Sequence, residues 1–402
     1  MPDRFDVIIV GAGPAGSSCA YFLARAGLRV LLLDKAVFPR DKTCGDGLVP
    51  RALPILAEMG VLEEVSHHAY RLSHLTVTAP SGHRVGFSIP HLPAAPNYAL
   101  VIPRLKLDTI LMQAAVEAGA NFINAAHVRG LHPSADTVTV DYLWNGERIS
   151  VQSPVVILAT GASSALFDQL NYPTPRPHIV AARAYFKDIP DLENHFQFRF
   201  DGVVLPGYGW VFPLSPSTAN IGAGFIRTGK DTHYSVRTAF ERFIDSPAMR
   251  KRLTGASRVG DLKSFPIRTD FASSPVAAGR VLMIGEAAGL VNPLTGDGID
   301  FALESGKLAA EHLLHALHQK AAAYPDAQTY DALLRHHYQN LFRFSAHVSR
   351  LSLNRFALNA LVPVAAARPR LPRALVSLLL GAKPVPDRIS PLKLAKGIIA
   401  NR

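Results

Sequence analysis

The first 160 residues of this 402-residue chain alternate short apolar runs with glycine turns and helical periodicity. An apolar run at 7–10 leads directly into the glycine-rich turn GAGPAG at 11–16. Helical periodicity then continues until Gly27, and a second apolar run at 30–33 finishes on Asp34. A strand, a glycine turn, a helix and a second strand within about thirty residues are typical of a dinucleotide-binding βαβ unit.

Each polar or glycine position of this unit has a chemical reason. Gly11 allows a tight turn, Gly13 lets the backbone approach a diphosphate, and Gly16 lets helix and strand pack closely. The free N–H groups of the helix N-terminus favour phosphate oxygens. Asp34 can accept hydrogen bonds from an adenosine ribose. The opening of the chain therefore predicts a dinucleotide site.

Further along, patterning predicts a hairpin, two helices and several strands. The expected helices are 51–65 and 104–118, and the expected hairpin is 76–89. The expected strands are 122–128, 138–144, 148–151, 155–158, 179–186, 195–200 and 219–226, with prolines clustered at 173, 175 and 177. The strands after residue 171 read as a separate, mostly antiparallel sheet.

A second buried-strand signature returns at 279–285 and is followed by Glu286 and by the sequence GDGI at 296–299. We expect a long helix from 300 to 314, and then helical segments from about 330 that are cut by prolines 363, 369, 372, 384 and 391. The predicted fold is α/β: a Rossmann-like nucleotide-binding domain (1–75, 99–170 and 270–325), an inserted antiparallel substrate domain (76–98 and 171–269) and a C-terminal helical tail (326–402).

Composition adds a membrane preference to this picture. Hydrophobic residues make up 48% of the chain and charged ones 18%, without an unbroken apolar stretch long enough to span a bilayer. The net charge is +11, and positions 343–402 hold eleven Lys and Arg residues against one Asp. Few aromatic side chains lie there to stack on bases, whereas Leu, Val and Ala are plentiful. We therefore expect an anionic membrane surface as partner, and no nucleic acid.

The first strand leaves no room for a signal peptide, so we expect the protein to stay in the cytoplasm, peripherally associated with the inner face of the membrane. Two cysteines, Cys19 and Cys44, imply no disulfide framework. Cys19 is expected in the core. His312, His315 and His318 lie three apart on a helix, and solvent-exposed surface is the preferred interpretation, so no metal site is expected.

The chain carries one glycine fingerprint, which favours tightly bound FAD over a two-Rossmann enzyme that also binds NAD(P)H. Four strings then show a resemblance: GAGPAG, CGDG at 44–47, LPGYGWVFP at 205–213 and GEAAGLVNPLTGDGI at 285–299. Through them the chain resembles the geranylgeranyl reductase family, within the flavoproteins that resemble the aromatic hydroxylases. The resemblance covers 5–314 and implies FAD-dependent reduction of isolated double bonds in a polyprenyl chain of a lipid or quinone.

The resemblance and the βαβ unit together give a set of expected site residues. The expected FAD contacts are Gly11, Gly13, Pro14, Ala15, Gly16, Asp34, Lys35, Cys44, Gly45, Arg104, Val128, Gly161, Gly285, Glu286, Pro293, Gly296, Gly298 and Ile299. Tyr208, Trp210 and Phe212 alternate along one strand face and are expected to line the substrate cavity. Cys44 is the expected catalytic proton donor, with bound water as the alternative source. An external donor, NADPH or a ferredoxin-like protein, would reduce the flavin.

Several interpretations stay open at this point. Tyr208, Trp210 and Phe212 could be core residues, Cys44 could be inert, and Arg104 could be a solvated residue at a helix start. Glu286 stands where the family usually has Asp, one methylene shorter. Two alternative functions remain: an FAD-dependent monooxygenase of the aromatic-hydroxylase-like group, and a non-catalytic FAD-binding protein at a membrane.

Overall fold

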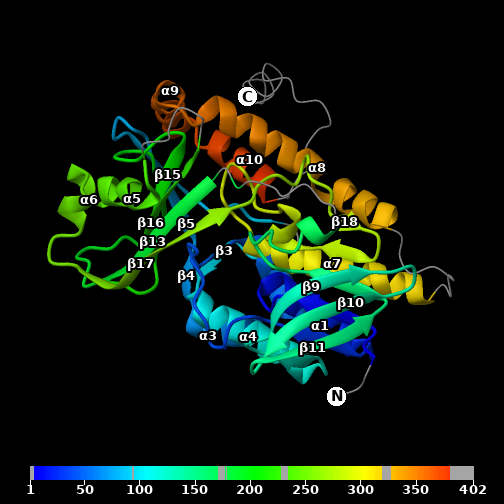
Figure 1. Cartoon of the computed structure of the whole chain (residues 1–402). Coiled ribbons are helices and arrows are strands. Elements are labelled where there is room, and N and C mark those ends of the chain that lie inside the picture. The colour runs from blue at the N-terminus through cyan, green and yellow to red at the C-terminus, as the bar shows by residue number, and fades with distance from the viewer. Residues whose placement is uncertain are drawn as a thin grey trace.

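The computed structural model describes residues 4–92, 95–170, 177, 179–227, 234–318 and 327–380. Two β-sheets lie at opposite ends of the molecule, and the C-terminal helices extend from one to the other (Figure 1). The expected prolines at 173, 175, 384 and 391, and the basic residues beyond 380, lie outside the described residues.

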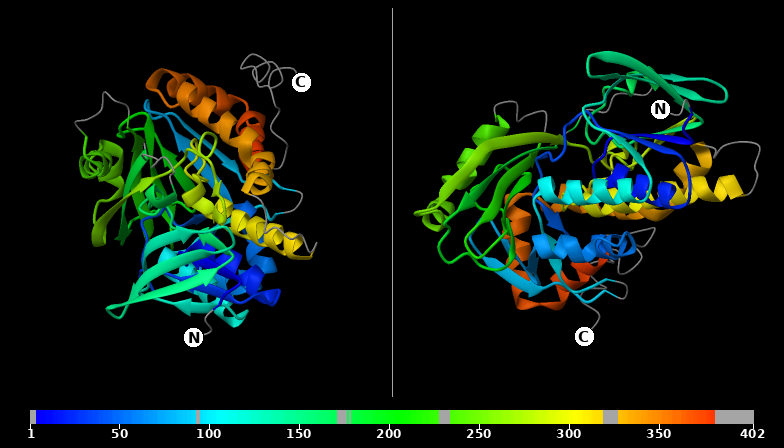
Figure 2. Two further views of the ribbon diagram at one scale, coloured as in Figure 1. Left: turned by 45° about the vertical axis from the view of Figure 1, so that its right-hand side comes forward. Right: turned by 90° about the horizontal axis from the view of Figure 1, so that it is seen from below.

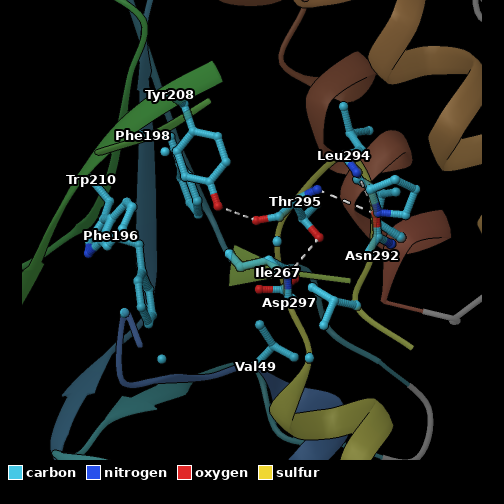
Figure 3. A pocket seen from close by; sticks show the side chains of 18 of the residues that line it. Val49, Phe196, Phe198, Tyr208, Trp210, Ile267, Asn292, Leu294, Thr295 and Asp297 are labelled. Carbon is cyan, nitrogen blue, oxygen red and sulfur yellow. Dashed lines mark hydrogen bonds between the residues drawn. The ribbon is translucent and has the colours of Figure 1, made fainter. Parts of the chain in front are cut away.

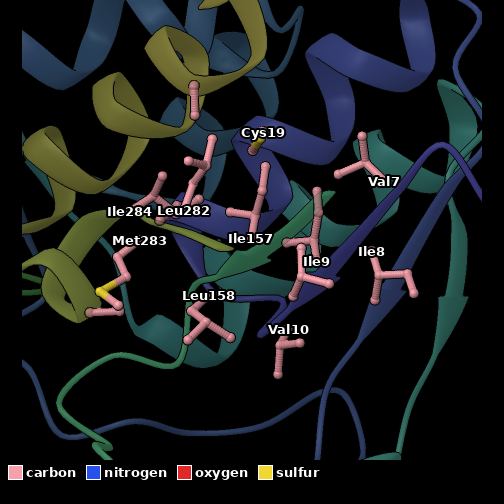
Figure 4. Close-up of a cluster of buried hydrophobic side chains, with 14 of the residues drawn as sticks. Val7, Ile8, Ile9, Val10, Cys19, Ile157, Leu158, Leu282, Met283 and Ile284 are labelled. Carbon is pink, nitrogen blue, oxygen red and sulfur yellow. The ribbon is translucent and has the colours of Figure 1, made fainter. Parts of the chain in front are cut away.

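The first large sheet contains the N-terminal strand of the described residues and has six strands in the order β18-β19-β12-β1-β2-β8. Its strands are β1 (Val7–Val10), β2 (Val30–Leu33), β8 (Asn121–Ile123), β12 (Val155–Leu158), β18 (Ala277–Ala278) and β19 (Val281–Met283). All neighbours are parallel except β18 and β19. Every residue of β1, β2 and β12 is buried, as expected for parallel strands that are covered on both faces (Figure 4).

Helices α1 (Pro14–Arg25), α4 (Arg104–Glu117) and α7 (Ile299–His318) pack together beside this sheet, with α1 in contact with both others. A three-stranded antiparallel sheet, β9 (His127–Pro133), β10 (Val138–Trp144) and β11 (Glu147–Ser153), contributes to the same core. The approach of α7 to α1 requires Gly306, because a Cβ there would lie 2.4 Å from the Ala15 carbonyl oxygen. This approach brings the late part of the chain next to the N-terminus of α1.

The second large sheet has seven strands in the order β17-β13-β16-β15-β14-β5-β6. They are β5 (His74–Thr78), β6 (Arg84–Ser88), β13 (Ile179–Lys187), β14 (Phe196–Arg199), β15 (Gly207–Pro213), β16 (Ala219–Ile226) and β17 (Ser257–Ile267). Only the β14–β5 pair is parallel. Helix α5 (Val236–Ile244) packs on β13 and β16, next to α6 (Pro247–Arg252).

Short elements connect the two sheets. A small antiparallel sheet joins β3 (Gly47–Leu48), β4 (Tyr70–Leu72) and β7 (Ala99–Val101), with helices α2 (Leu53–Glu58) and α3 (Leu62–His68) between β3 and β4. Three 3₁₀ turns lie at η1 (Pro50–Ala52), η2 (Asp168–Leu170) and η3 (Gly285–Ala288).

The C-terminal region consists of α8 (Ala327–Ser352), α9 (Arg355–Ala367) and α10 (Arg370–Leu379). Helix α8 packs on the part of the molecule that contains the six-stranded sheet, here called the first half. The buried Tyr330 hydroxyl donates to the Met283 carbonyl at 2.9 Å, and the Tyr338 hydroxyl donates to Glu304 at 2.9 Å. Helices α9 and α10 pack on β6 of the seven-stranded sheet (Figure 2). The tail thus contacts both halves of the molecule.

Three sequence expectations were wrong in detail. The predicted helix 51–65 is broken at Gly60, which has φ +75°. The predicted strand 122–128 is two strands in different sheets, because Ala125 turns the chain with φ +52°. Pro363 does not end a segment but lies inside α9, and Pro372 lies in the first turn of α10, where a missing N–H costs no hydrogen bond.

We predict that Gly306→Ala destabilises the protein by about 1–3 kcal/mol, since overpacking at the contact of α7 with the α1 backbone outweighs the gain of about 1 kcal/mol in helix propensity. Urea unfolding would measure the change. Gly86→Ala is the matched control, because a Cβ there would meet Thr76 Oγ1 at an ordinary 3.8 Å. Equal stabilities of the two variants would contradict the close approach.

Candidate active site

One cavity of about 670 Å³ runs between the two large sheets. One part is lined by the start of α1 and by residues 291–299, and another by the strands β14 and β15 (Figure 3). A third part is lined by apolar side chains of α9 and α10. The cavity therefore connects the glycine turn to a long apolar wall.

The glycine turn has the geometry of an anion site. Gly11 has φ +110°, and a Cβ there would lie 2.3 Å from the Ala159 carbonyl oxygen. A Cβ placed at Gly13 would have two cations as its nearest neighbours, with Arg40 Nη2 at 3.5 Å and Arg104 Nη2 at 3.9 Å. No side chain caps the N-terminus of α1. The free backbone N–H groups and the two guanidinium groups fit a diphosphate.

The two arginines are held by one buried carboxylate. Asp108 accepts from Arg104 Nε at 2.6 Å and Nη2 at 2.7 Å, and from Arg40 Nη1 at 2.8 Å. Arg104 and Asp108 are buried. The interpretation of Arg104 as a solvated residue was therefore wrong: its guanidinium is buried against Asp108, and its Nη2 and that of Arg40 both lie within 4 Å of the Cβ position of Gly13.

Asp34 directly follows β2 and is buried, with Oδ2 accepting from the Ala12 N–H and Oδ1 from the Ala36 N–H, both at 2.8 Å. Each oxygen keeps a lone pair for a further donor, so a ribose hydroxyl fits. Lys35 is exposed. Val128 belongs to the core beside β1 and does not line the cavity.

The segment after β19 lines the cavity opposite the glycine turn. A Cβ at Gly285 would lie 2.9 Å from the Ala15 Cβ, so this glycine permits close packing of the segment on α1. Glu286 forms an ion pair with Lys42 at 2.9 Å and accepts from the Arg268 N–H at 3.3 Å. Pairing with Lys42 keeps the Glu286 carboxylate directed at the cavity, where both residues are found.

Cys44 lies on a loop between the halves, half-buried and on the cavity wall. Burial raises the pKa of the Cys44 thiol, and the nearby positive charge of Arg104 opposes this rise. Burial likewise raises the pKa of the neighbouring Asp46 to about 6, against hydrogen bonds from Tyr185 and Asn220. Because the pKa of the Cys44 thiol is raised, the thiol carries its proton at neutral pH.

Five aromatic side chains of β14 and β15 form one wall: Phe196, Phe198, Tyr208, Trp210 and Phe212. Their ring centroids are 4.8–6.3 Å apart along the wall. The Tyr208 hydroxyl donates to the Thr295 carbonyl at 2.6 Å and so ties this wall to the segment 292–298 (Figure 3). Phe196 and Phe198, on the neighbouring strand, were not among the expected residues.

The structure brings most of the expected residues to one cavity. Those on its wall are Gly13, Pro14, Ala15, Cys44, Gly45, Arg104, Gly161, Tyr208, Trp210, Phe212, Glu286, Pro293, Gly296, Gly298 and Ile299. Gly11, Gly16, Asp34, Lys35, Val128 and Gly285 lie off the wall. Arg40, Lys42 and Asp108 were missed. The charged string Arg40-Asp-Lys42, placed between the first βαβ unit and the CGDG string, was the available signal.

The histidines of α7 form no common site. His312 is half-buried and lies beside Tyr330, with ring centroids 5.6 Å apart, so its expected place on the solvent-exposed surface was wrong; burial lowers its pKa. His315 is exposed, and the His318 side chain lies outside the described part of the chain. Within that part, no group of three His, Cys, Asp or Glu side chains could hold a metal ion.

Comparison with known proteins identifies the family. A model described as FAD binding domain matches residues 4–345. The menaquinone reductase of Mycobacterium tuberculosis is 37% identical over 326 residues, covering 78% of this chain and 77% of the relative. The chain belongs to the geranylgeranyl reductase family of FAD-dependent oxidoreductases.

Two further relatives extend the comparison. Digeranylgeranylglycerophospholipid reductase 1 of Methanopyrus kandleri is 28% identical over 361 residues, covering 87% of this chain and 90% of the relative. The crystal structure of a geranylgeranyl bacteriochlorophyll reductase-like protein from Thermoplasma acidophilum has a TM-score of 0.79 at 22% identity, over 99% of this chain and 96% of that one. The predicted α/β fold and the predicted FAD cofactor are confirmed.

We predict that Arg104→Gln lowers FAD affinity at least tenfold, about 1.4 kcal/mol, because one of the two cations beside Gly13 is lost while Asp108 keeps Arg40 in place. Titration of the apoprotein with FAD, followed by flavin fluorescence, would measure this. Arg250→Gln, at an exposed position of α6, is the control. Unchanged FAD affinity in Arg104→Gln would rule out the assignment.

Proposed function

We propose that this enzyme saturates isolated double bonds in a polyprenyl chain of a lipid or quinone. The observation that carries the proposal is the continuity of one cavity, from the glycine turn past Cys44 to an aromatic and aliphatic wall. A long apolar lining suits an isoprenoid chain, whose only recognisable features are its methyl groups and double bonds. The names of the menaquinone and digeranylgeranyl lipid relatives support the same substrate class.

The residues at the glycine turn would hold FAD: Gly13 and α1 with Arg40 and Arg104 at the diphosphate, and Asp34 at the ribose. When bound and reduced by an external donor, NADPH or a ferredoxin-like protein, FAD supplies a hydride. An unactivated alkene accepts a hydride poorly, so the protein must position it and exclude water. Phe196, Phe198 and Trp210 provide the dry wall for this.

Cys44 is the proton donor in this proposal. Its thiol is protonated at neutral pH, lies on the cavity wall and belongs to the loop nearest the aromatic strands. The Sγ–H bond breaks as the proton reaches the alkene carbon that does not receive the hydride, and the thiolate is stabilised by the nearby Arg104 charge. Water then restores the thiol.

The enzyme would take its substrate from the inner face of the membrane. Among the described helices, none is long and apolar enough to cross a bilayer. Leu351, Phe356, Leu361 and Val364 are exposed, Phe356 to 87%, and Leu361 and Val364 also line the cavity. The six charged side chains of 343–380 are all arginines. An apolar face among arginines suits an anionic lipid surface.

We predict that reduced holoenzyme, mixed without oxygen with a menaquinone bearing an unsaturated tail, reoxidises and that each turnover adds two hydrogens to the tail. Stopped-flow absorbance and mass spectrometry would measure the two events. Cys44→Ala should slow alkene reduction about 100-fold without slowing flavin reduction by dithionite. Cys19→Ala, a buried cysteine of α1, is the control.

Two results would contradict this prediction. Reoxidation only by oxygen, with a hydroxylated product, would indicate the monooxygenase alternative. Flavin that no polyprenyl compound reoxidises would leave the chain without the proposed substrate class. An unchanged rate in Cys44→Ala would instead assign the proton to bound water.

We predict that Leu351→Ser combined with Phe356→Ser weakens binding to phosphatidylglycerol-containing vesicles at least tenfold, because about 1.5–3 kcal/mol of burial is lost for each side chain. Co-sedimentation with vesicles would measure it. Val37→Ser, exposed to 64% but distant in sequence from α9, is the control. Equal binding of the two variants would show that another surface meets the lipid.

A further inference from the structure

A single buried amide connects the cavity wall to the backbone of Cys44. Asn220 lies on β16 and is fully buried. Its Nδ2 donates to the Cys44 carbonyl and to Asp46 Oδ2, both at 2.8 Å. Its Oδ1 accepts from Trp210 Nε1 at 2.9 Å. The orientation of the amide is unambiguous, because the indole can only donate and the carbonyl can only accept.

The other hydrogen bonds of the loop lie on either side of the Cys44 backbone, while the Cys44 side chain packs on a hydrophobic cluster and lies near Arg104. Asp46 accepts from the Tyr185 hydroxyl at 2.7 Å and from the Arg104 N–H at 3.3 Å, and its carbonyl accepts from the Ile102 N–H at 3.0 Å. Lys42 pairs with Glu286 on the other side of Cys44. Between these anchors, the side-chain hydrogen bond to the Cys44 backbone comes from the Asn220 amide.

Glycines on both sides of Asp46 allow the aromatic wall to reach the loop. A Cβ at Gly45 would lie 3.0 Å from Phe212 Cε2, and a Cβ at Gly47 would lie 3.2 Å from Phe196 Cε1. On β16, a Cβ at Gly222 would lie 2.1 Å from Trp210 Cζ2, so the indole rests directly on that strand. The indole, the amide and the loop are therefore packed without space for independent movement.

We propose that Asn220 is a positioning residue for Cys44, which couples contact at Trp210 on the cavity wall to the placement of the thiol. This inference deepens the proposed function, on which it rests for the chemical role of Cys44. A bound chain that presses on the Trp210 indole moves the amide oxygen, and the same rigid amide carries that movement to the Cys44 carbonyl. The thiol is thus set in place by β16, which pairs with the strand β15 that carries Trp210.

The test measures Cys44 directly, without turnover. Purified holoenzyme is alkylated with iodoacetamide between pH 6 and 10, and the modified Cys44 peptide is quantified by mass spectrometry. Cys19 is fully buried and does not compete. Asn220→Ala frees the loop, so we expect alkylation at pH 7.5 to rise at least fivefold and the apparent pKa of the thiol to fall toward its ordinary value, since burial raises it.

Two further variants keep the inference testable if Asn220→Ala does not fold. Asn220→Asp has the same shape but opposes a carboxylate to Asp46, and Trp210→Phe removes the indole N–H donor while it keeps an aromatic ring. We expect both to raise the alkylation rate, Trp210→Phe by less. Gln169→Ala is the matched control: this amide also bonds two backbone groups, Leu131 N–H and Arg129 C=O, away from the cavity. Its alkylation profile should stay within twofold of the wild type.

Alkylation profiles of Asn220→Asp and Trp210→Phe that match the wild type would overturn the inference, whatever their thermal stability. The outcome is separate from that of the proposed function. A protein that reduces no polyprenyl chain but shows the expected alkylation changes would refute the proposed function and leave Asn220 as the residue that places Cys44.

Discussion

The pairing of charges on the loop between β2 and β3 is the constraint on which the active site depends. The half-buried Asp41 accepts from the buried Arg183 at 2.6 Å and from the exposed Lys263 at 2.7 Å, both on the seven-stranded sheet. The next residue, Lys42, pairs with Glu286 of the first half. One short loop is thus tied to both halves, and the loss of Asp41 would be costly because it would take this carboxylate from the buried Arg183 guanidinium. The cavity has its walls because this loop fixes where they meet.

The placement of charges also explains why the nucleotide end of the cavity suits an anion. Asp108 is fully buried and bonds to both guanidinium groups, and Asp34 Oδ2 lies 3.8 Å from Arg40 Nη2. Both Nη2 atoms nevertheless lie within 4 Å of the Cβ position of Gly13, beside the uncapped start of α1. A site built this way is preorganised for an anion, because the arginines are held in place by Asp108 before the ligand arrives. Removing Asp108 would leave the buried Arg104 guanidinium beside the half-buried Arg40 without the carboxylate that they share.

Local patterns were sufficient to predict the fold and the cofactor. The turn at 11–16 with Asp34 predicted the nucleotide unit, and the string at 205–213 predicted the family; both predictions are confirmed. The roles of the individual site residues, and the domain boundaries, remain predictions. What the sequence could not show is long-range pairing: Lys42 meets Glu286 across 244 positions, and Asn220 reads only as one polar residue in an apolar strand.

Irregular backbone was the other limit on prediction. Residues 122–128 are apolar enough for one strand, and only the positive φ of Ala125 separates β8 from β9. Pro363 was expected to end a segment because proline usually stops a helix. Inside α9 it is tolerated, and the helix is held by packing of Val362 on Val85 and Phe87 of β6. Tertiary contacts therefore decided what local propensity left open.

Under the proposed function, the C-terminal helices would serve two surfaces, the cavity and a lipid surface, because of the chemistry of an isoprenoid chain. Moving such a chain from the bilayer into water costs a free energy of about 0.8 kcal/mol for each CH₂ group. Transfer between bilayer and enzyme therefore requires a continuous apolar path. Leu361 and Val364 are both exposed and part of the cavity wall, which places the beginning of such a path on α9. A helix that only anchored the protein would not need side chains facing the cavity. Under the proposed function, the basic, apolar character of the tail would serve the substrate route as much as a membrane contact.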